Sequence, residues 1–278
     1  MQKINYSMLV SDFDGTLVKD DGTVSEYTRE SIRRYTEMGG RFVISTGRMP
    51  SGILPQVKEL GLTGLLCCGQ GAVILDIDSG ERVFDRRMPN GISVRICEEM
   101  EKLHLHIQVY DFWEYYSNKQ NEALKWYENA VKAKAVVVKD KPISEFVRET
   151  GMQPYKILAI VPPQDNARIR ATLQAFGFAG CNVTKSAANL VELGNAGCSK
   201  GTAVEFLANH YGIDVEKTMA VGDQINDLPM IERAGLGIAV KNADKPLKEK
   251  ANVVLEYTNE QDAVAKIIET YGYTEDKK

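Results

Sequence analysis

The chain has 278 residues, of which 44% are hydrophobic and 26% are charged, and its formal net charge is −4. This length suits two domains, and the composition is that of an ordinary globular protein. A net negative charge without a basic, aromatic-rich stripe argues against nucleic-acid binding, and no apolar run approaches the ~20 residues of a membrane span.

Five cysteines are present, an odd number without the spacing of a metal site. They predict buried free thiols in a reducing cytosol. The N-terminus enters the first predicted strand without a signal-peptide core. We therefore expect a cytoplasmic protein that binds neither nucleic acid nor a membrane and is a monomer or a small homo-oligomer.

Strand and helix signals alternate over residues 1–80. A first strand, Met8-Leu9-Val10, ends at Asp12, and the polar segment after it, with Asp21-Gly22, predicts a small hairpin over residues 17–23. The next predicted elements are a helix over 25–38, a strand over 41–44, a helix that ends near 60 and a strand over 65–68. This alternation predicts a parallel sheet with right-handed crossovers.

From about Phe84 to Glu192, short strands mix with helices. Strands are predicted at 105–110, 114–117, 135–139, 155–161, 183–186 and 190–192, and helices at 92–103, 121–132, 143–149 and 165–176. Pro89-Asn90-Gly91 and Gly194-Asn195 mark the two ends of this region. The pattern predicts an inserted α+β domain over residues 85–192, which interrupts an α/β core of residues 1–84 and 193–278.

After residue 195 the alternation of helix and strand resumes. The predicted elements are a helix over 199–211, a strand over 218–221, a helix from about 228 with Pro229 in its first turn, strands over 237–240 and 253–255, and a helix over 260–271. The acidic and lysine-rich tail after Tyr273 is predicted to fray. The core is therefore predicted to be a Rossmann-like parallel sheet covered by helices.

Polar residues cluster where three of the predicted strands end. In open parallel sheets, ligands bind beyond the carboxyl ends of the strands, so these residues are candidates for one site. The clusters are Asp12 with Asp14, Thr46-Gly47-Arg48, and Gly222-Asp223 with Asn226 and Asp227. Carboxylates this close repel each other unless a cation lies between them, which favours a hard divalent ion. An acidic strand-to-turn connection is the simpler alternative for the first pair.

The helix predicted to start at 199 can face the same edge of the sheet. It carries Lys200 in its first turn, where a lysine opposes the helix dipole unless an anion binds nearby. Thr46 and the amide of Gly47 could also bind an anion at a strand-to-helix turn. Simpler alternatives stay open: a helix cap for Thr46 or Asp227, and a solvated surface position for Lys200.

Together these residues supply carboxylates for Mg²⁺, and a lysine, a hydroxyl and amides for a phosphate, which is the equipment of phosphoryl transfer. No Gly-x-x-x-x-Gly-Lys-Ser/Thr loop occurs, which excludes a P-loop enzyme. An aspartate is then the candidate nucleophile, because carboxylates form aspartyl-phosphates. The three histidines lack metal-ligand spacing and are interpreted as structural or surface residues.

The order of these motifs resembles the haloacid dehalogenase superfamily, and within it the Cof-type phosphatases with a type IIB cap. The resemblance spans essentially the whole chain, including the insert between the second and third motifs. The four motifs are Asp12-Phe13-Asp14-Gly15-Thr16-Leu17, Thr46-Gly47-Arg48, Lys200-Gly201 and Gly222-Asp223-Gln224-Ile225-Asn226-Asp227. One position departs from the pattern: many relatives carry Asn-Gly-Ala where this chain has Gln70-Gly71-Ala72, which leaves the role of that side chain open.

The resemblance implies a role for each residue. Asp12 would be the nucleophile, and Asp14 would be the general acid and base, with its side chain free for proton transfer. Mg²⁺ would be bound by Asp12, the backbone carbonyl of Asp14 and Asp223, with Asp227 in support. The phosphate would be held by Phe13, Thr46, Gly47, Lys200 and Asn226.

These observations predict a Mg²⁺-dependent phosphatase of small phosphorylated metabolites, such as sugar phosphates or phosphorylated cofactors, in which the insert closes over the site. Aromatic residues of the insert, together with Lys185, could contact the substrate, although packing within the insert is the simpler explanation for the aromatic residues. A phosphomutase of the same superfamily and a phospho-accepting signalling module remain alternatives. The second carboxylate, Asp14, argues against the signalling module because it would speed turnover.

Overall fold

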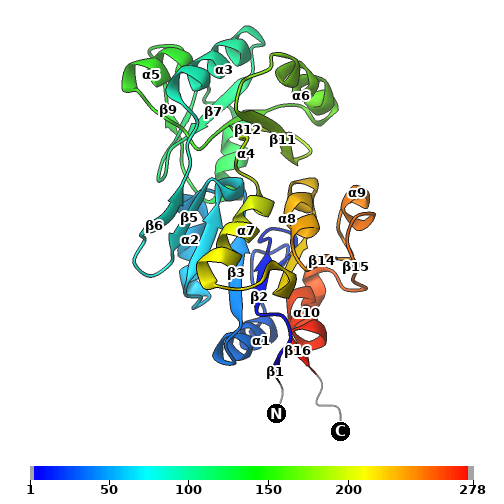
Figure 1. Ribbon diagram of the computed structural model, residues 1–278. Helices are drawn as coiled ribbons and strands as arrows, with labels where there is room; N and C mark the ends of the chain where they lie inside the picture. The colour runs from blue at the N-terminus through cyan, green and yellow to red at the C-terminus, as the bar shows by residue number, and fades with distance from the viewer. Residues whose placement is uncertain (1–2, 275–278) are drawn as a thin grey trace.

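The computed structural model describes residues 3–274, which form two large sheets at opposite ends of the molecule (Figure 1). The strands are β1 (Lys3–Ile4), β2 (Met8–Ser11), β3 (Arg41–Ser45), β4 (Leu65–Cys68), β5 (Val73–Asp76), β6 (Arg82–Asp85), β7 (His106–Tyr110), β8 (Tyr115–Ser117), β9 (Val136–Val137), β10 (Lys156–Ile160), β11 (Cys181–Ala187), β12 (Leu190–Asn195), β13 (Thr218–Gly222), β14 (Leu236–Ala239), β15 (Val253–Val254) and β16 (Tyr273–Thr274). The helices are α1 (Glu26–Glu37), α2 (Pro50–Glu59), α3 (Asn90–Lys102), α4 (Glu122–Val131), α5 (Ile143–Thr150), α6 (Asn166–Ala175), α7 (Lys200–Tyr211), α8 (Leu228–Arg233), α9 (Lys245–Lys248) and α10 (Ala263–Tyr271). Short 3₁₀ turns are η1 (Gly69–Gly71), η2 (Pro163–Asp165), η3 (Val215–Lys217), η4 (Ile225–Asp227) and η5 (Asn259–Gln261).

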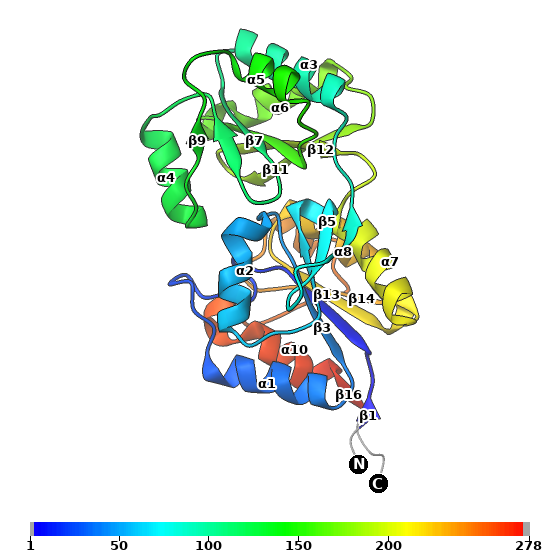
Figure 2. The same ribbon diagram turned by 90° about the vertical axis from the view of Figure 1, so that its left-hand side faces the viewer.

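The larger sheet has the strand order β15-β14-β13-β2-β3-β4-β5-β6. From β15 to β4 all neighbours are parallel, which confirms the predicted α/β core. Helix α1 packs beside α10 and α7 beside α8, and these two pairs lie on opposite sides of the sheet (Figure 2). Because helices cover both faces, the central strands are buried along their whole length and read as unbroken apolar runs.

Strands β5 and β6 extend the larger sheet with antiparallel pairs that the sequence analysis did not predict. The connection from β4 to β5 consists of η1 and Ala72, which is too short for a crossover, so the chain must turn back along β4. The apolar run Val73-Ile74-Leu75, followed by Asp78-Ser79-Gly80, is the signal that could have identified this hairpin.

The smaller sheet has the order β11-β12-β10-β7-β8-β9 and is antiparallel except for the pair of β8 and β9. Helices α3, α5 and α6 pack against one another or against its strands. Its apolar side chains, such as Ile107, Ile157 and Val191, belong to a second hydrophobic core. This arrangement supports an inserted domain, whose boundaries at 85 and 192 stay a prediction; β12 runs past Glu192 to Asn195.

Three details of the secondary structure differ from expectation or lie beyond it. No pair of strands forms over residues 17–23, where a hairpin was predicted; only a tight turn is closed, by the Lys19 N–H that donates to the Thr23 carbonyl. The last helix begins at Ala263, since left-handed Asp262 (φ 59°) separates it from η5. The predicted fraying concerns residues 275–278, which lie outside the described residues, whereas β16 pairs with β1.

The prediction of buried free thiols is confirmed for four of the five cysteines, and Cys181 is partly exposed. All five cysteines are free, and four of them, Cys67, Cys68, Cys97 and Cys198, are buried. Within residues 3–274, none of the helices is both long and apolar enough to cross a bilayer.

His106 in β7 is a buried titratable group of the smaller sheet. Its side chain is 5% exposed, and its Nε2 atom lies 3.0 Å from the Ser117 hydroxyl. Burial, together with nearby Lys119, lowers the pKa of His106 to about 4 from an ordinary value of 6.5. The unfolded chain therefore binds a proton at a higher pH than the folded chain does, so the contribution of neutral His106 to stability is complete above pH 6.5 and is lost as the pH falls toward 4.

We predict that the wild type loses more stability on mild acidification than the variant His106→Gln, which has no titratable ring. Between about pH 7 and about pH 5 the difference should reach about 2 kcal/mol. Urea titrations at both pH values measure it, and the shared carboxylates cancel in the comparison. Equal losses in the two proteins would contradict the assignment of His106 as a buried neutral histidine.

Candidate active site

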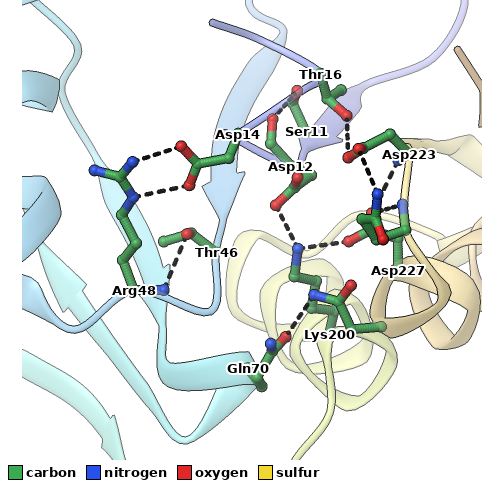
Figure 3. A network of polar contacts seen from close by, with 12 residues as sticks. Ser11, Asp12, Asp14, Thr16, Thr46, Arg48, Gln70, Lys200, Asp223 and Asp227 are labelled. Atoms are coloured by element: carbon green, nitrogen blue, oxygen red, sulfur yellow. Dashed lines mark hydrogen bonds and ion pairs between the residues drawn. The ribbon is translucent and has the colours of Figure 1, made fainter. Parts of the chain in front are cut away.

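The parallel strands β2, β3 and β13 end at the same edge of the larger sheet. In register, Ser11 pairs with Ile44 of β3 and with Val221 of β13, so the residues that follow emerge side by side. Helix α7 begins at this edge. Figure 3 shows Asp12, Asp223, Asp227 and Lys200 in one network of polar contacts, so residues nearly two hundred positions apart in the chain converge.

Lys200 lies at the centre of this cluster and is 1% exposed. Its Nζ atom donates to Asp12 Oδ1 and to Asp227 Oδ1, each at 2.5 Å. Burial alone would lower the pKa of Lys200, but the two carboxylates outweigh burial and raise it, so the ammonium stays charged. Lys200 is therefore not a solvated surface lysine, which was the simpler interpretation of this residue.

The start of α7 is placed by close backbone packing. Ser199 caps the helix, since its hydroxyl accepts the N–H of Thr202. A Cβ added at Gly71 would lie 2.3 Å from the Ser199 carbonyl, and one at Gly201 would lie 2.4 Å from the Pro229 carbonyl. These two glycines therefore allow the helix to approach η1 and α8 closely enough for Lys200 to reach Asp12.

The carboxylates of Asp12, Asp223 and Asp227 each offer an oxygen within 4.8 Å of the others. Burial, and then the charge of Asp227, raises the pKa of Asp12 well above its ordinary value, although Lys200 opposes the shift. The same two causes raise the pKa of Asp223 to about 6. Three carboxylates facing one ammonium leave two negative charges uncompensated, so the cluster favours a divalent cation.

Local hydrogen bonds orient the two carboxylates from the fourth motif. Thr16 Oγ1 donates to Asp223 Oδ1 at 3.1 Å, which ties the first motif to the fourth. Asp227 Oδ2 accepts the backbone N–H groups of Asp223 and Gln224, both at 2.9 Å. Asp227 makes no side-chain cap bond to α8, so its simpler alternative does not apply; its carboxylate instead orients the turn before η4 and pairs with Lys200.

Asp14 has a different environment from Asp12. Its carboxylate forms a two-point ion pair with Arg48, with Nη2 2.5 Å from Oδ1 and Nε 2.8 Å from Oδ2. This ion pair was not predicted from the sequence, and the role of Asp14 in proton transfer stays a prediction. Figure 3 shows Asp14 directed toward Arg48 and away from Lys200. Arg48 is itself anchored to α2 through Gln56, so the pair fixes the direction of the Asp14 carboxylate.

The residues expected to hold a phosphate also lie at this edge. Thr46 is 1% exposed and its hydroxyl oxygen accepts the Arg48 N–H at 3.1 Å, so its hydroxyl hydrogen can still be donated. Thr46 does not cap α2, which begins at Pro50 after Met49. The side chain of Phe13 is buried in the hydrophobic core, so only its backbone can face the site.

The sequence analysis gave no role to a buried ion pair of the insert, formed by Lys156 in β10 and Glu192 in β12. Lys156 Nζ lies 3.1 Å from Glu192 Oε1 and also donates to the carbonyl of Gly47 at 3.0 Å. Each residue is a lone charged position in an otherwise apolar strand. That exception to the hydrophobic pattern is the signal that could have identified them.

A cavity of about 570 Å³ opens between the two sheets and is lined by Asp12 and Asp14 on one side. The insert contributes Trp126, Tyr127, Lys156, Lys185, Ala187 and Leu190 to its wall. Lys185 thus lines the cavity in which the substrate would lie. Tyr110 and Tyr115 stack on each other, with their ring centroids 5.0 Å apart, which agrees with packing within the insert. A second cavity, of about 680 Å³, lies within the insert and is not lined by the carboxylate cluster.

The sequence is similar to those of known hydrolases and phosphatases. A family model described as haloacid dehalogenase-like hydrolase matches residues 9–268. A Haemophilus influenzae protein assigned provisionally as a phosphatase is 32% identical over 270 residues, which cover 95% of this chain and 97% of the relative. The 5-amino-6-(5-phospho-D-ribitylamino)uracil phosphatase YitU of Bacillus subtilis is 26% identical over 273 residues, with 95% and 97% covered. The pyridoxal phosphate phosphatase YbhA of Escherichia coli is 27% identical over 274 residues, with 94% and 97% covered.

Solved structures share the fold. A haloacid dehalogenase-like hydrolase from Bacteroides thetaiotaomicron superposes with a TM-score of 0.82 at 29% identity, covering 95% of this chain and 98% of that chain. The sugar phosphatase BT4131, of subclass IIB, superposes with a TM-score of 0.83 at 19% identity, covering 96% and 99%. At that identity the second likeness concerns the fold alone.

We predict that Lys200 stabilises the metal-free protein more than Asp12 does. The variant Lys200→Met leaves Asp12 and Asp227 as buried, unpaired carboxylates and should lower the free energy of unfolding by about 3–5 kcal/mol. The variant Asp12→Asn removes one crowded carboxylate while Lys200 keeps Asp227, and its stability should equal or exceed that of the wild type. Urea unfolding in EDTA measures both. The charge argument fails if Lys200→Met is as stable as the wild type or if Asp12→Asn is the weaker of the two variants.

Proposed function

This chain belongs to the haloacid dehalogenase-like hydrolase family and is a phosphatase, and from this premise we propose that it hydrolyses phosphate monoesters of small metabolites, with Mg²⁺, through an aspartyl-phosphate on Asp12. The observation that carries the proposal is buried Lys200 between Asp12 and Asp227. A carboxylate held in one direction beside a cation is suited to attack a phosphoryl group, whose negative charge the cation attracts.

The donor set fits Mg²⁺, which prefers oxygen ligands from carboxylates. The two uncompensated negative charges of the cluster match the charge of a divalent ion, and burial, with the charge of Asp227, already raises the pKa of Asp223 to about 6. We assign the ion to the side chains of Asp12 and Asp223 and the backbone carbonyl of Asp14, with Asp227 in support. When bound, the ion offsets the negative charge of the phosphoryl group.

The reaction uses the two carboxylates of the first motif in different roles. Asp12 attacks phosphorus, and the bond from phosphorus to the leaving oxygen breaks as Asp14 gives that oxygen a proton. Asp14 then takes a proton from a water molecule, which attacks the phosphorus of the aspartyl-phosphate and releases inorganic phosphate. Because Arg48 donates to both oxygens of Asp14, a proton that Asp14 binds must take a lone pair that Arg48 does not use.

The remaining residues of the edge hold the phosphoryl group during both steps. The donors are the Thr46 hydroxyl, the Gly47 amide, the Lys200 ammonium, the Asn226 amide and the backbone beside Phe13. Lys200 contributes most to charge neutralisation, since its charge is buried and therefore poorly screened.

The leaving group of the substrate would occupy the cavity between the two sheets. Its wall combines the half-exposed Trp126 ring, the uncharged Ala187 and the cation Lys185. This mixture accommodates a small polar metabolite better than a long apolar chain. Relatives named for phosphorylated heterocycles, such as pyridoxal phosphate, support phosphorylated cofactors as substrates alongside sugar phosphates. Closure of residues 85–192 over the cavity would exclude water from the reacting centre.

We predict that Asp12→Asn abolishes phosphate release because an amide cannot serve as the nucleophile. With Mg²⁺ and a panel of sugar phosphates, phosphorylated cofactors and nucleotides, the variant should lose at least about 10³-fold in kcat on any ester that the wild type hydrolyses. Asp78→Asn, in the exposed turn between β5 and β6, is a matched control that should keep full activity. Substantial phosphate release by Asp12→Asn would remove Asp12 as nucleophile, and a wild type that only moves phosphate between positions in the presence of a bisphosphate would be a mutase.

We further predict that Mg²⁺ binding depends on Asp223. Added Mg²⁺ should raise the Tm of the wild type, because the ion binds the folded carboxylate cluster better than the unfolded chain. The variant Asp223→Asn should need a concentration at least about tenfold higher for the same shift, since it loses one charged ligand. Thermal unfolding over a Mg²⁺ titration measures this, and identical titration curves for the two proteins would contradict the assignment.

A further inference from the structure

Gln70 occupies an unusual backbone conformation between two glycines. It has φ 60° and ψ 33°, in the left-handed region, and lies in η1 directly after β4. Gly and Asn adopt this conformation readily, whereas a residue with a longer side chain is disfavoured there. A glutamine at this position therefore needs side-chain contacts that a shorter residue would not make.

The side chain of Gln70 bridges the larger sheet and the insert. Its Oε1 accepts from Asn226 Nδ2 at 3.2 Å, and its Nε2 donates to Glu192 Oε2 at 3.4 Å. The amide also lies against the second motif, since a Cβ added at Gly47 would come within 2.5 Å of Nε2. The backbone N–H of Gln70 donates to the Thr46 carbonyl at 3.1 Å. One residue thus contacts the second motif, the fourth motif and the insert.

The far end of this bridge is a buried ion pair. Glu192 and Lys156 are each 4% exposed and lie 3.1 Å apart, and Ser186 also donates to Glu192 at 2.7 Å. Burial alone would lower the pKa of Lys156, but the Glu192 carboxylate outweighs burial and raises it. Because Lys156 forms this ion pair with Glu192, the side chain that faces Gln70 is a hydrogen-bond acceptor.

This acceptor sets the direction of two amide groups in turn. The NH₂ end of Gln70 must face Glu192, which turns the Gln70 carbonyl toward Asn226. That carbonyl requires a donor, so the NH₂ end of Asn226 faces Gln70. Asn226 Oδ1 is buried without a hydrogen-bond partner among the described residues, so the surroundings of Asn226 alone do not favour this orientation. The second hydrogen of Asn226 Nδ2 stays available for a phosphoryl oxygen.

We propose that Gln70 is a positioning residue, which transmits the orientation imposed by the Lys156–Glu192 pair to Asn226 and so holds its NH₂ group toward the phosphoryl group. The proposal rests on the role that the proposed function gives to Asn226. It makes phosphate binding depend on the contact between the insert and the larger sheet: when the insert moves away, Glu192 leaves Gln70 and Asn226 loses its fixed orientation. An asparagine at position 70 is one methylene shorter and cannot span Glu192 and Asn226 together.

The test separates function from stability, because Gln70→Asn relieves the backbone conformation while breaking the bridge. With Mg²⁺ and p-nitrophenyl phosphate, Gln70→Asn should lose about tenfold or more in kcat/KM, mainly through kcat, and bind inorganic phosphate more weakly in calorimetry. Its Tm should equal or exceed that of the wild type. A residue that is only structural would lose activity and Tm together.

Two further variants and a control refine the result. Gln70→Glu keeps the length but cannot donate to Glu192, so it should be impaired as well. In the background of Asn226→Ala, Gln70→Asn should have no additional effect, because Gln70 acts through Asn226. His104→Asn relieves another left-handed residue, φ 54°, far from the site, and should change neither kcat nor phosphate affinity.

The proposal would be overturned if Gln70→Asn kept the full kcat/KM and phosphate affinity of the wild type. It would also be overturned if Gln70→Asn lowered kcat/KM equally in the wild type and in the Asn226→Ala background. If the wild type hydrolyses no phosphate ester, the proposed function fails, and phosphate affinity alone then decides the role of Gln70: weaker binding by the variant supports the proposal, and unchanged binding overturns it.

Discussion

The burial of one ammonium between two carboxylates is the constraint on which the rest of the site depends. Lys200 can contact Asp12 and Asp227 only because α7 starts at the carboxyl edge of the larger sheet, and α7 can start there only because glycines permit its close approach to η1 and α8. The charges around Lys200 remain unbalanced in favour of the carboxylates. The fold therefore holds an excess of negative charge at this edge of the sheet, which a divalent cation would offset.

The larger sheet and the insert both contribute residues to the site. The larger sheet supplies the carboxylates and Lys200, whereas the insert supplies a cavity wall and a buried ion pair that reaches across to Gly47 and Gln70. Because the polar groups of Lys156 and Glu192 find their partners partly in the larger sheet, separation of the two parts would leave buried charges with fewer partners. The contact between the parts thus combines this polar bridge with apolar packing, since insert residues such as Tyr127 and Leu190 join the hydrophobic cluster of the larger sheet.

Much of this arrangement could be predicted from the sequence, because periodicity is local. The strand Leu65–Cys68 and the start of α7 agree with expectation to within a residue, and motifs at the ends of parallel strands must share one edge. Contacts between distant side chains could not be predicted in this way. Nothing near Asp14 in the sequence indicates its pair with Arg48. The contact of Lys156 with the Gly47 carbonyl depends on how β10 packs against the larger sheet, which the sequence pattern does not show. The hairpin of β5 and β6 was not predicted, although the apolar run Val73-Ile74-Leu75 and the turn residues after it indicate one.

The pairing of β1 with β16 has a consequence for the connectivity of the whole chain. Lys3 lies opposite Thr274 at the end of the molecule farthest from the smaller sheet (Figure 1). Strands β1 and β16 form a small sheet of their own, which brings residues 3–4 and 273–274 side by side. The first and last described strands therefore depend on each other for their backbone hydrogen bonds, and neither lines the cavity.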